Sequence, residues 1–333
     1  MTLGVGVIGV GVLGRRHAEN VARLAPRARL VAVADAHAAA AESVAREFGC
    51  VWTAEPRELM ARLDVHAVVI ATGSDTHASL TSAAAAAGKD ILCEKPLALS
   101  VGAAQDAADA ADRAGVRLQI GFMRRYDPAY RAAYEAIERG EIGRPVLFAA
   151  ISRDAQPPPR GYFASPGAGG LFIDSAIHDF DLARWMMRDE VAAVSATGSI
   201  VACHDLADVQ SIDLGLATLT FKGGAAGSVQ VYRRAVYGYD IRTEVVGTEG
   251  TVQVGNHWWR AVQVLRAGGI THTMPQHWLE RFGEAYGLEM ADWVDRMARD
   301  QPAAVTGEDG VRAVALAVAA EQARESSALV HVP

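Results

Sequence analysis

The chain has 333 residues, half of them hydrophobic and about a fifth charged, with a formal net charge of −7. A chain of this length favours two domains over one core, and its composition is that of a globular protein. Because the balance is acidic and no long Lys/Arg run occurs, we expect no nucleic-acid partner. No apolar run approaches membrane-spanning length, so no membrane partner is expected either.

The three cysteines, Cys50, Cys93 and Cys203, are scattered and form no C-x-x-C pair. This pattern indicates neither a disulfide framework nor a structural zinc site, and it is consistent with a reducing cytoplasm. The N-terminus is rich in glycine and has no basic leader, which predicts a strand and turn rather than a signal peptide. We therefore expect a cytoplasmic protein without a bound metal.

A glycine fingerprint follows the first apolar run. Gly4 to Val10 predicts a strand, and Val12 to Leu24 predicts the helix after it. Between them the sequence reads G-x-G-x-x-G, which permits a tight turn and brings a pyrophosphate close to a helix N-terminus. The alternative is a glycine-rich turn with no ligand. On the first interpretation a dinucleotide is held by Gly9, Gly11, Val12, Leu13 and Gly14.

An acidic residue in the next expected strand bears on the choice of dinucleotide. Leu30 to Ala34 predicts a strand, and Asp35 follows it at the distance where a carboxylate binds ribose hydroxyls. A carboxylate there repels a 2′-phosphate, which favours NAD over NADP. Arg15 and Arg16 could bind such a phosphate, although a solvated helix face is the simpler interpretation.

Helices and strands then alternate. Helices are predicted at Ala38 to Phe48, Ser79 to Ala87 and Val101 to Ala114, and strands at Ala67 to Ala71, Asp90 to Cys93 and Arg117 to Ile120. This order predicts an α/β domain over residues 1–122, a Rossmann-type doubly wound parallel sheet with ligands at the carboxyl ends of its strands.

Three of those strand ends carry chemistry-bearing residues, namely Thr72-Gly73, Glu94-Lys95-Pro96 and Gly121 to Asp127. Thr72, Gly73 and His77 are expected to flank the cofactor, although His77 could equally be a helix residue without a ligand. Lys95, within Glu94-Lys95-Pro96, can donate to a substrate oxygen, or it can be a solvated lysine at a strand exit. The proline fixes the backbone there and could adopt a cis bond that aims the lysine.

The pattern changes in residues 123–333, where we expect an α+β domain. A helix is predicted at Pro128 to Arg139, and two more at Trp278 to Met297 and Val311 to Ser326. Strands joined by short turns predict a large, open and mostly antiparallel sheet. They are expected at Val146 to Arg153, Val194 to Val201, Ile212 to Phe221, Gly227 to Tyr232, Ile241 to Val246, Thr251 to Val254 and Val262 to Arg266. Helices cover one face of such a sheet, and a partner subunit is the expected cover for the other.

The segment from Gly169 to Trp185 predicts a glycine turn followed by a helix. In it, Asp174, His178 and Asp181 follow helical steps beside an apolar stripe, so carboxylates flank an imidazole one turn away on each side. That arrangement can hold a histidine in one tautomer and raise its basicity. The alternative is a solvated acidic face with a bystander histidine.

Together these motifs resemble the Gfo/Idh/MocA oxidoreductase family nearly end to end. The resemblance lies in the glycine fingerprint, Glu94-Lys95-Pro96, Gly121 to Asp127 (GFMRRYD) and Gly169 to Asp181. Within the family the chain is most similar to inositol 2-dehydrogenases, on the loop Arg153 to Pro159, the segment Ile177 to Arg184 and Tyr237 to Asp240. The resemblance implies NAD-dependent oxidation of a secondary hydroxyl of a cyclic polyol and a homo-oligomer, commonly a tetramer.

The resemblance also implies residue roles. His178 falls on the catalytic base, Asp174 on its orienting partner and Lys95 on the donor to the reacting oxygen. The substrate site is implied to contain Met123, Arg124, Asp154, Tyr239 and Trp278, each of which could instead be a packing or surface residue. Some relatives have His and Asn where this chain has Ser152 and Asp154, which leaves the inositol stereoisomer open.

Three other functions compete with this one. The same chemistry could act on an aldose or an anhydro-sugar. A non-catalytic dinucleotide sensor would retain the glycine fingerprint but need not retain Lys95, Asp174 and His178 together. A metal-dependent hydrolase is disfavoured because the ten histidines show no spacing such as H-E-x-x-H.

Overall fold

The computed structural model describes residues 2–163, 165, 167–209, 211–255 and 264–332. The chain forms two compact units. The N-terminal unit contains Met1–Met123, Pro166–Ala168 and Tyr286–Val314, and the second unit contains Arg124–Ser165, Gly169–Ala285 and Ala315–Pro333. The stretch Tyr286–Val314, which the expected division placed in the second domain, thus packs with the N-terminal sheet.

A six-stranded sheet forms the centre of the N-terminal unit, in the order β3-β2-β1-β4-β5-β6 with every pair parallel. Its strands are β1 (Leu3–Ile8), β2 (Ala28–Ala34), β3 (Val51–Thr53), β4 (Ala67–Ile70), β5 (Asp90–Glu94) and β6 (Leu118–Gly121). The predicted doubly wound sheet is confirmed. The direction of winding reverses between β1 and β4, which places the ligand site of such a fold at their carboxyl ends.

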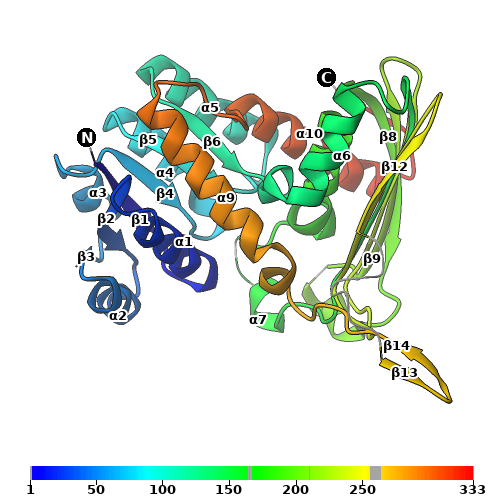
Figure 1. Ribbon diagram of the computed structural model, residues 1–333, viewed down its shortest axis with the longest axis horizontal. Helices are drawn as coiled ribbons and strands as arrows, with labels where there is room; N and C mark the ends of the chain where they lie inside the picture. Colours follow the sequence, from blue (N-terminus) through cyan, green and yellow to red (C-terminus); the bar gives the residue numbers. More distant parts are fainter. Residues whose placement is uncertain (1, 164, 166, 210, 256–263, 333) are drawn as a thin grey trace. The chain divides into compact units, whose positions relative to one another are not determined.

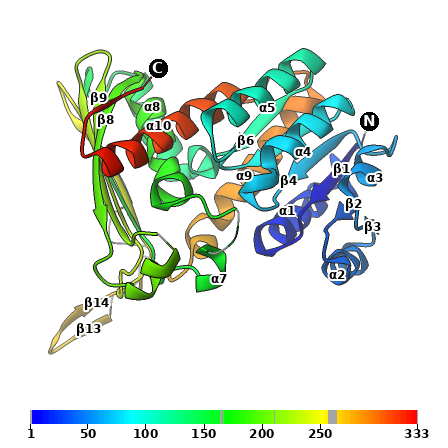
Figure 2. The same cartoon turned by 180° about the vertical axis from the view of Figure 1, so that it is seen from behind.

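Helices cover both faces of this sheet (Figures 1 and 2). The helices α1 (Val12–Arg23) and α2 (Ala38–Phe48) lie on one face, where the later part of α9 (Trp278–Ala298) joins them. Their core includes Val5 and Val7 from the sheet and Trp293 from α9. The other face carries α3 (Pro56–Met60), α4 (Ser74–Ala86) and α5 (Val101–Ala114).

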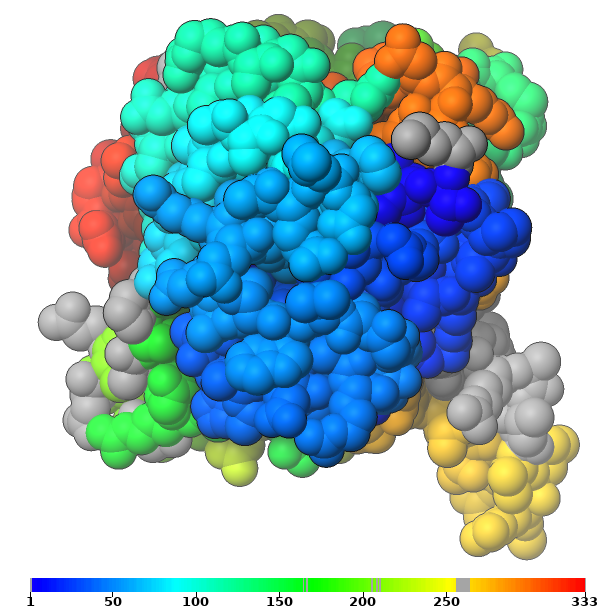
Figure 3. Space-filling view, turned by 90° about the vertical axis from the view of Figure 1, so that its left-hand side faces the viewer, coloured from blue at the N-terminus to red at the C-terminus, as the bar shows by residue number. Residues whose placement is uncertain are grey.

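Seen from the side of β3, α2 and α3, blue residues from the first βα repeats adjoin the cyan residues of the later ones (Figure 3). The element β3 was not predicted because it has only three residues, too few for a period to register. The start of α4 at Ser74 precedes the predicted start at Ser79, since Ser74 to His77 are polar and add nothing to an apolar stripe.

A seven-stranded sheet forms the second unit, in the order β12-β11-β7-β10-β9-β8-β15. Only the β7–β10 pair is parallel among its described pairs, so the predicted open and mostly antiparallel sheet is confirmed. Its strands are β7 (Pro145–Arg153), β8 (Val191–Ser199), β9 (Leu214–Phe221), β10 (Ala226–Tyr232), β11 (Asp240–Gly247), β12 (Thr251–Val254) and β15 (Val330–His331).

A separate hairpin consists of β13 (Val264–Arg266) and β14 (Gly269–Thr271). Residues 262 and 263, the first two of the strand predicted there, lie outside the described residues. The second unit also contains helices α6 (Pro128–Glu138), α7 (Arg160–Phe163) and α8 (Ile177–Met187), two 3₁₀ turns, η1 (Met123–Tyr126) and η3 (His204–Val209), and the later part of α10 (Gly307–Ser326).

The two faces of the second sheet differ in cover. Side chains alternate along β9, so that Ala217 and Leu219 are buried while Leu214 and Leu216 remain 39% and 38% exposed. Helix α8 packs on β7 and β10. One face of this sheet is therefore exposed in the single chain, and on β9 it carries Leu214 and Leu216 beside Thr218 and Thr220. Within the described part of the chain, no helix combines the length and apolar character needed to cross a bilayer.

Candidate active site

The glycine turn after β1 can hold only glycine at two of its positions. Gly9 has φ +82°, and a Cβ there would lie 2.7 Å from the carbonyl oxygen of Ala71. A Cβ on Gly14 would lie 1.8 Å from the carbonyl oxygen of Gly9. Gly11 meets nothing within 4 Å and makes no side-chain cap, so the N-terminus of α1 is open. Such a turn leaves backbone N–H groups facing outward and fits a pyrophosphate.

Asp35 ties the end of β2 to this turn. Its carboxylate accepts one hydrogen bond from the backbone N–H of Val10 at 2.8 Å and another from that of His37 at 2.8 Å. A carboxylate oxygen has two lone pairs, so both oxygens can still accept from ribose hydroxyls. Asp35 therefore supports the turn, and it carries a negative charge of the kind that repels a 2′-phosphate.

The two arginines that could have bound a 2′-phosphate are used elsewhere. Arg15 pairs with Glu47 at 2.7 Å, and Arg16 pairs with Glu19 at 2.7 Å. Both pairs lie on helix surfaces, as the simpler interpretation of the sequence had it. This arrangement favours NAD.

At the end of β4, the Thr72 hydroxyl contacts that of Thr76 at 2.7 Å, next to Gly73, the N-cap of α4. His77, predicted to flank the cofactor, is buried in α4. Its ring nitrogens contact the backbone carbonyl oxygens of Pro96 at 2.7 Å and Thr72 at 3.1 Å. Its ring therefore touches the two loops rather than presenting a free nitrogen.

At the end of β5, Glu94 is a buried anchor. One carboxylate oxygen lies 2.7 Å from Nε2 of His17, and the other accepts from the backbone N–H of Lys95 at 3.3 Å. Lys95 itself is partly exposed, and its bond to Pro96 is cis. The sequence showed the tripeptide, but the buried partner of Glu94 could not be seen in it.

A second buried acid lies near Glu94. The Glu289 side chain, on α9, is fully buried. Burial raises the pKa of its carboxyl well above the ordinary 4.5, and the charges of Glu94 and Asp292 raise it further. The charged form of Glu289 is therefore disfavoured in the folded protein. No motif in the sequence points to it.

In the second unit, Asp174 lies in a single π-helical turn, η2 (Phe172–Ala176), which runs directly into α8. Its two carboxylate oxygens accept from the Tyr162 hydroxyl at 2.7 Å and from Arg233 at 2.8 Å. His178, in the first turn of α8, is buried. A π turn widens the helix at this point, a feature that is frequent at functional sites.

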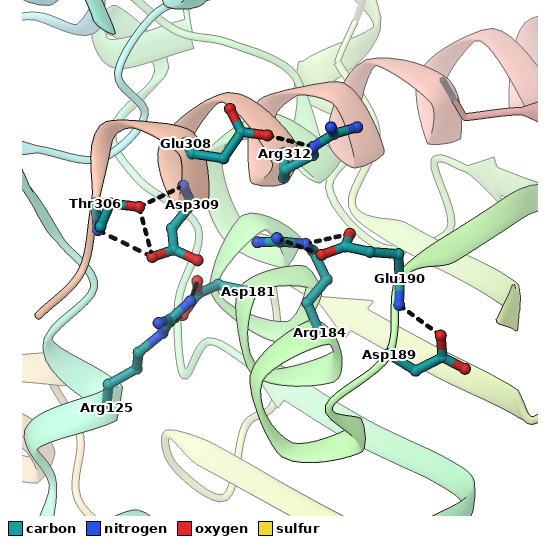
Figure 4. A network of polar contacts seen from close by, with 9 residues as sticks. All are labelled: Arg125, Asp181, Arg184, Asp189, Glu190, Thr306, Glu308, Asp309 and Arg312. Carbon is teal, nitrogen blue, oxygen red and sulfur yellow. Dashed lines mark hydrogen bonds and ion pairs between the residues drawn. The ribbon is translucent and has the colours of Figure 1, made fainter. Parts of the chain in front are cut away.

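Asp181 was expected to flank His178 but is engaged with Arg125. The two side chains form a buried bidentate pair with distances of 2.9 and 2.5 Å (Figure 4).

The same figure shows Arg184 with Glu190 on the second unit. It also shows the first turn of α10 in the N-terminal unit, where Thr306 and Asp309 cap the helix reciprocally.

Arg124 lies at the start of the second unit and is 2% exposed. Its guanidinium donates to Asp179 at 2.6 Å, and the Ser152 hydroxyl donates to the same carboxylate at 2.6 Å. The predicted substrate contact thus coincides with a buried ion pair. Burial by itself lowers the pKa of Arg124, but the adjacent Asp179 charge outweighs it, so the guanidinium stays charged.

The other predicted substrate residues lie as follows. Tyr239 is buried edge-on against Phe282, and burial raises the pKa of its hydroxyl. Asp154 is partly exposed, and its charge acts on the hydroxyls of both Tyr162 and Tyr239. Asp154 therefore lies close to Tyr162, which donates to Asp174, and to Tyr239, which lies close to Arg124. Met123, at the end of the first segment of the N-terminal unit, is buried. Trp278 is partly exposed and begins α9 next to His277.

Comparison with known proteins agrees with this architecture. Residues 3–122 match the model described as "Oxidoreductase family, NAD-binding Rossmann fold", and residues 130–253 match "GFO/IDH/MocA C-terminal domain". The fold and the glycine turn define an NAD-binding oxidoreductase. More specifically, the chain belongs to the Gfo/Idh/MocA oxidoreductase family.

Similar proteins include inositol dehydrogenases. The chain is 38% identical to scyllo-inositol 2-dehydrogenase (NAD(+)) of Bacillus subtilis, over 94% of this chain and 92% of that protein. It is 35% identical to Myo-inositol 2-dehydrogenase of Thermotoga maritima, over 98% of each. Scyllo-inositol dehydrogenase from Lactobacillus casei, solved with bound NAD(H) and scyllo-inositol, superposes with a TM-score of 0.93 at 29% identity, covering 99% of each chain.

Proposed function

We propose that this protein is an NAD-dependent inositol 2-dehydrogenase that oxidises a secondary hydroxyl of myo- or scyllo-inositol. One observation carries the proposal. The chain combines an open glycine turn with a partly exposed Lys95 at the end of β5, and it places a doubly anchored Asp174 one helical turn before a buried His178. The nearly full-length similarity to inositol dehydrogenases supports the substrate class.

The oxidation needs a group that accepts the hydroxyl proton and a group that stabilises negative charge on the oxygen. His178 accepts the proton, because a neutral imidazole has a pKa near the working pH. Asp174 orients that ring and stabilises the imidazolium that forms. The Lys95 ammonium donates to the reacting oxygen, and NAD, when bound at the glycine turn, accepts the hydride.

An inositol presents hydroxyls around a ring with an apolar face, so its site combines polar groups with apolar surface. Asp154 and Arg124 supply polar groups, the Tyr239 hydroxyl supplies another, and Met123 and Trp278 supply apolar surface. The Ser152 hydroxyl donates to Asp179. At this position the chain therefore has a small group that supports the ion pair, where some relatives have histidine.

Exposed leucines on one face of the second sheet support a homo-oligomer. Leu147, Leu214 and Leu216 are each more than a third exposed on strands β7 and β9. We propose that a second copy of the chain covers this face, giving a dimer or a tetramer. We also propose a location in the cytoplasm, with which the three cysteines, none of them in a disulfide, are consistent.

The decisive experiment is a panel of polyols and sugars with NAD, followed by the absorbance of the reduced nicotinamide. We expect turnover of myo- or scyllo-inositol with kcat/KM well above that of aldoses and anhydro-sugars. A higher kcat/KM for an aldose would support the proposed chemistry but would show that the substrate is an aldose rather than an inositol. Tight NAD binding without turnover of any polyol would favour a dinucleotide sensor instead.

A further inference from the structure

His77 lies between two backbone carbonyl oxygens and beside the Cys93 side chain. Its side chain is 1% exposed, its Nδ1 lies 2.7 Å from the Pro96 carbonyl oxygen, and its Nε2 lies 3.1 Å from the Thr72 carbonyl oxygen. Neutral imidazole carries one N–H and one lone pair. In a neutral ring, one of these contacts would set a nitrogen lone pair against an oxygen lone pair. Two carbonyl partners are satisfied together only when both nitrogens carry a proton.

The surroundings of the ring favour that charge. Burial by itself lowers the pKa of His77, but the charge of Cys93 and a hydrogen bond with its side chain raise it, as do the Pro96 and Thr72 carbonyl oxygens, to about 9 overall. Cys93 is fully buried in β5. Two other acidic residues lie near these contacts. Glu94 binds His17, and Asp75, on α4 itself, is exposed beside Gly73. The Lys95 ammonium is a cation next to Pro96, and it opposes the positive charge on His77.

The two carbonyls belong to loops of different strands. Thr72 follows β4, and Pro96 follows Lys95 at the end of β5. These strands are hydrogen-bonded neighbours, with Ile70 opposite Cys93. The ring thus connects the carboxyl ends of two adjacent strands, at the edge of the sheet where a Rossmann fold binds its ligand. Two N–H donors from one buried ring fix the separation of the two loops.

We propose that His77 is a positioning residue that, as an imidazolium at neutral pH, holds the Lys95-Pro96 turn against the Thr72-Gly73 turn. It acts through the two carbonyls and does not touch the substrate. The catalytic part of the proposal rests on the proposed function, because the benefit lies in the placement of the Lys95 ammonium. The charge state of His77 does not depend on that function.

His66 provides a matched control. It lies in the same unit, at the start of β4 and therefore at the opposite edge of the sheet from Thr72. Its Nδ1 accepts a hydrogen bond from the backbone N–H of Gly4 at 2.9 Å. That nitrogen acts as an acceptor, so the His66 ring is not held between two carbonyl oxygens as the His77 ring is.

The first test is ¹⁵N–¹H correlation NMR of the histidine rings in the full chain without ligands. At pH 7.5 we expect His77 to give two protonated nitrogens that persist to about pH 9, while His66 gives one unprotonated nitrogen. His77→Gln and His66→Gln assign the two signals. A His77 ring with one unprotonated nitrogen at pH 7.5 would overturn the proposal, whatever the substrate is.

The second test is kinetic and compares the same two variants with NAD and inositol. Misplacing a catalytic group by a fraction of an ångström to about 1 Å costs up to about a hundredfold in rate. We expect His77→Gln to lower kcat by about ten- to a hundredfold with a much smaller change in NAD affinity, and His66→Gln to leave kcat unchanged. In the wild type, kcat should fall as pH rises through about 9. His77→Gln should lack that fall.

A His77→Gln variant with wild-type kcat and an unchanged alkaline limb would contradict the positioning role. If the wild type turns over no inositol, the NMR result still decides the charge state, so failure of the substrate assignment is distinguishable. If His77→Gln does not fold, the wild-type NMR titration decides the proposal alone.

Discussion

His17 and Glu94 form a buried pair, with Nε2 of His17 lying 2.7 Å from a carboxylate oxygen of Glu94. The other oxygen of Glu94 accepts from the backbone N–H of Lys95. Helix α1, which begins at the glycine turn, is therefore connected through two hydrogen bonds to the residue that we propose polarises the substrate. Charge-assisted hydrogen bonds of this kind fix the geometry of a site more firmly than neutral ones.

The buried Glu289 predicts how stability depends on pH. Its pKa is raised in the folded state, so above the ordinary 4.5 the folded protein binds more protons at this group than the unfolded chain does. Its contribution to stability is fully present below that value and decreases as pH rises toward the folded-state pKa. Glu289→Gln should remove this slope and raise the melting temperature at pH 8 more than at pH 5. Equal changes at both pH values would show that folding does not raise the pKa of Glu289.

Removing either proposed catalytic group should affect the rate rather than cofactor binding. We expect Lys95→Ala and His178→Ala each to lower kcat by about a hundredfold or more, because each removes a group that acts in the transition state. NAD affinity, measured by fluorescence titration, should change little. Unchanged turnover in either variant would remove that residue from the mechanism.

Asp35 should separate the charge effect on cofactor choice from the support of the glycine turn. Asp35→Asn loses the charge but keeps an oxygen that can accept from Val10 N–H, whereas Asp35→Ser loses the long acceptor as well. We expect both variants to bind NADP better than the wild type does, with NAD weakened more in Asp35→Ser. Isothermal titration with both cofactors measures this. The same NAD-to-NADP ratio in all three proteins would contradict the assignment.

The Arg124–Asp179 pair should show the asymmetry of a buried ion pair. Their side chains are 3% and 0% exposed. Arg124→Met leaves an unpaired buried carboxylate and should cost about 3–5 kcal/mol of unfolding free energy, while Arg124→Met combined with Asp179→Leu should cost less. Urea unfolding measures both. A double variant that is less stable than the single one would argue against an uncompensated charge. If Arg124 also contacts inositol, KM stays raised in the double variant.

The sequence predicted those parts of the fold that are encoded locally. The turn at Gly9 is one such part, because a backbone with φ +82° that touches Ala71 requires glycine and so leaves a visible signature. The alternation of strands and helices was likewise visible as a change of period. The three-residue β3 was not, since its edge position is decided by its pairing with β2.

The candidate site was predicted as a set of residues but not as a network. The partner of Glu94 lies 77 positions away in the chain, and that of Asp174 lies 59 positions away. Such pairs leave no spacing signal in a single sequence. A hint existed for His17, which follows Gly14 by three positions on the face of α1 that also carries Val21. For Asp181, helical spacing predicted a place beside His178. Its carboxylate pairs with Arg125, which helical spacing does not reveal.

The central claim is that Lys95 and His178, which belong to different units of the chain, act on the same hydroxyl. A crystal structure with NAD and the preferred inositol tests this most directly. We predict one ring hydroxyl within hydrogen-bonding distance of both the Lys95 ammonium and the His178 imidazole, with its carbon facing the nicotinamide. An inositol bound with its reacting hydroxyl beyond the reach of either side chain would contradict the account.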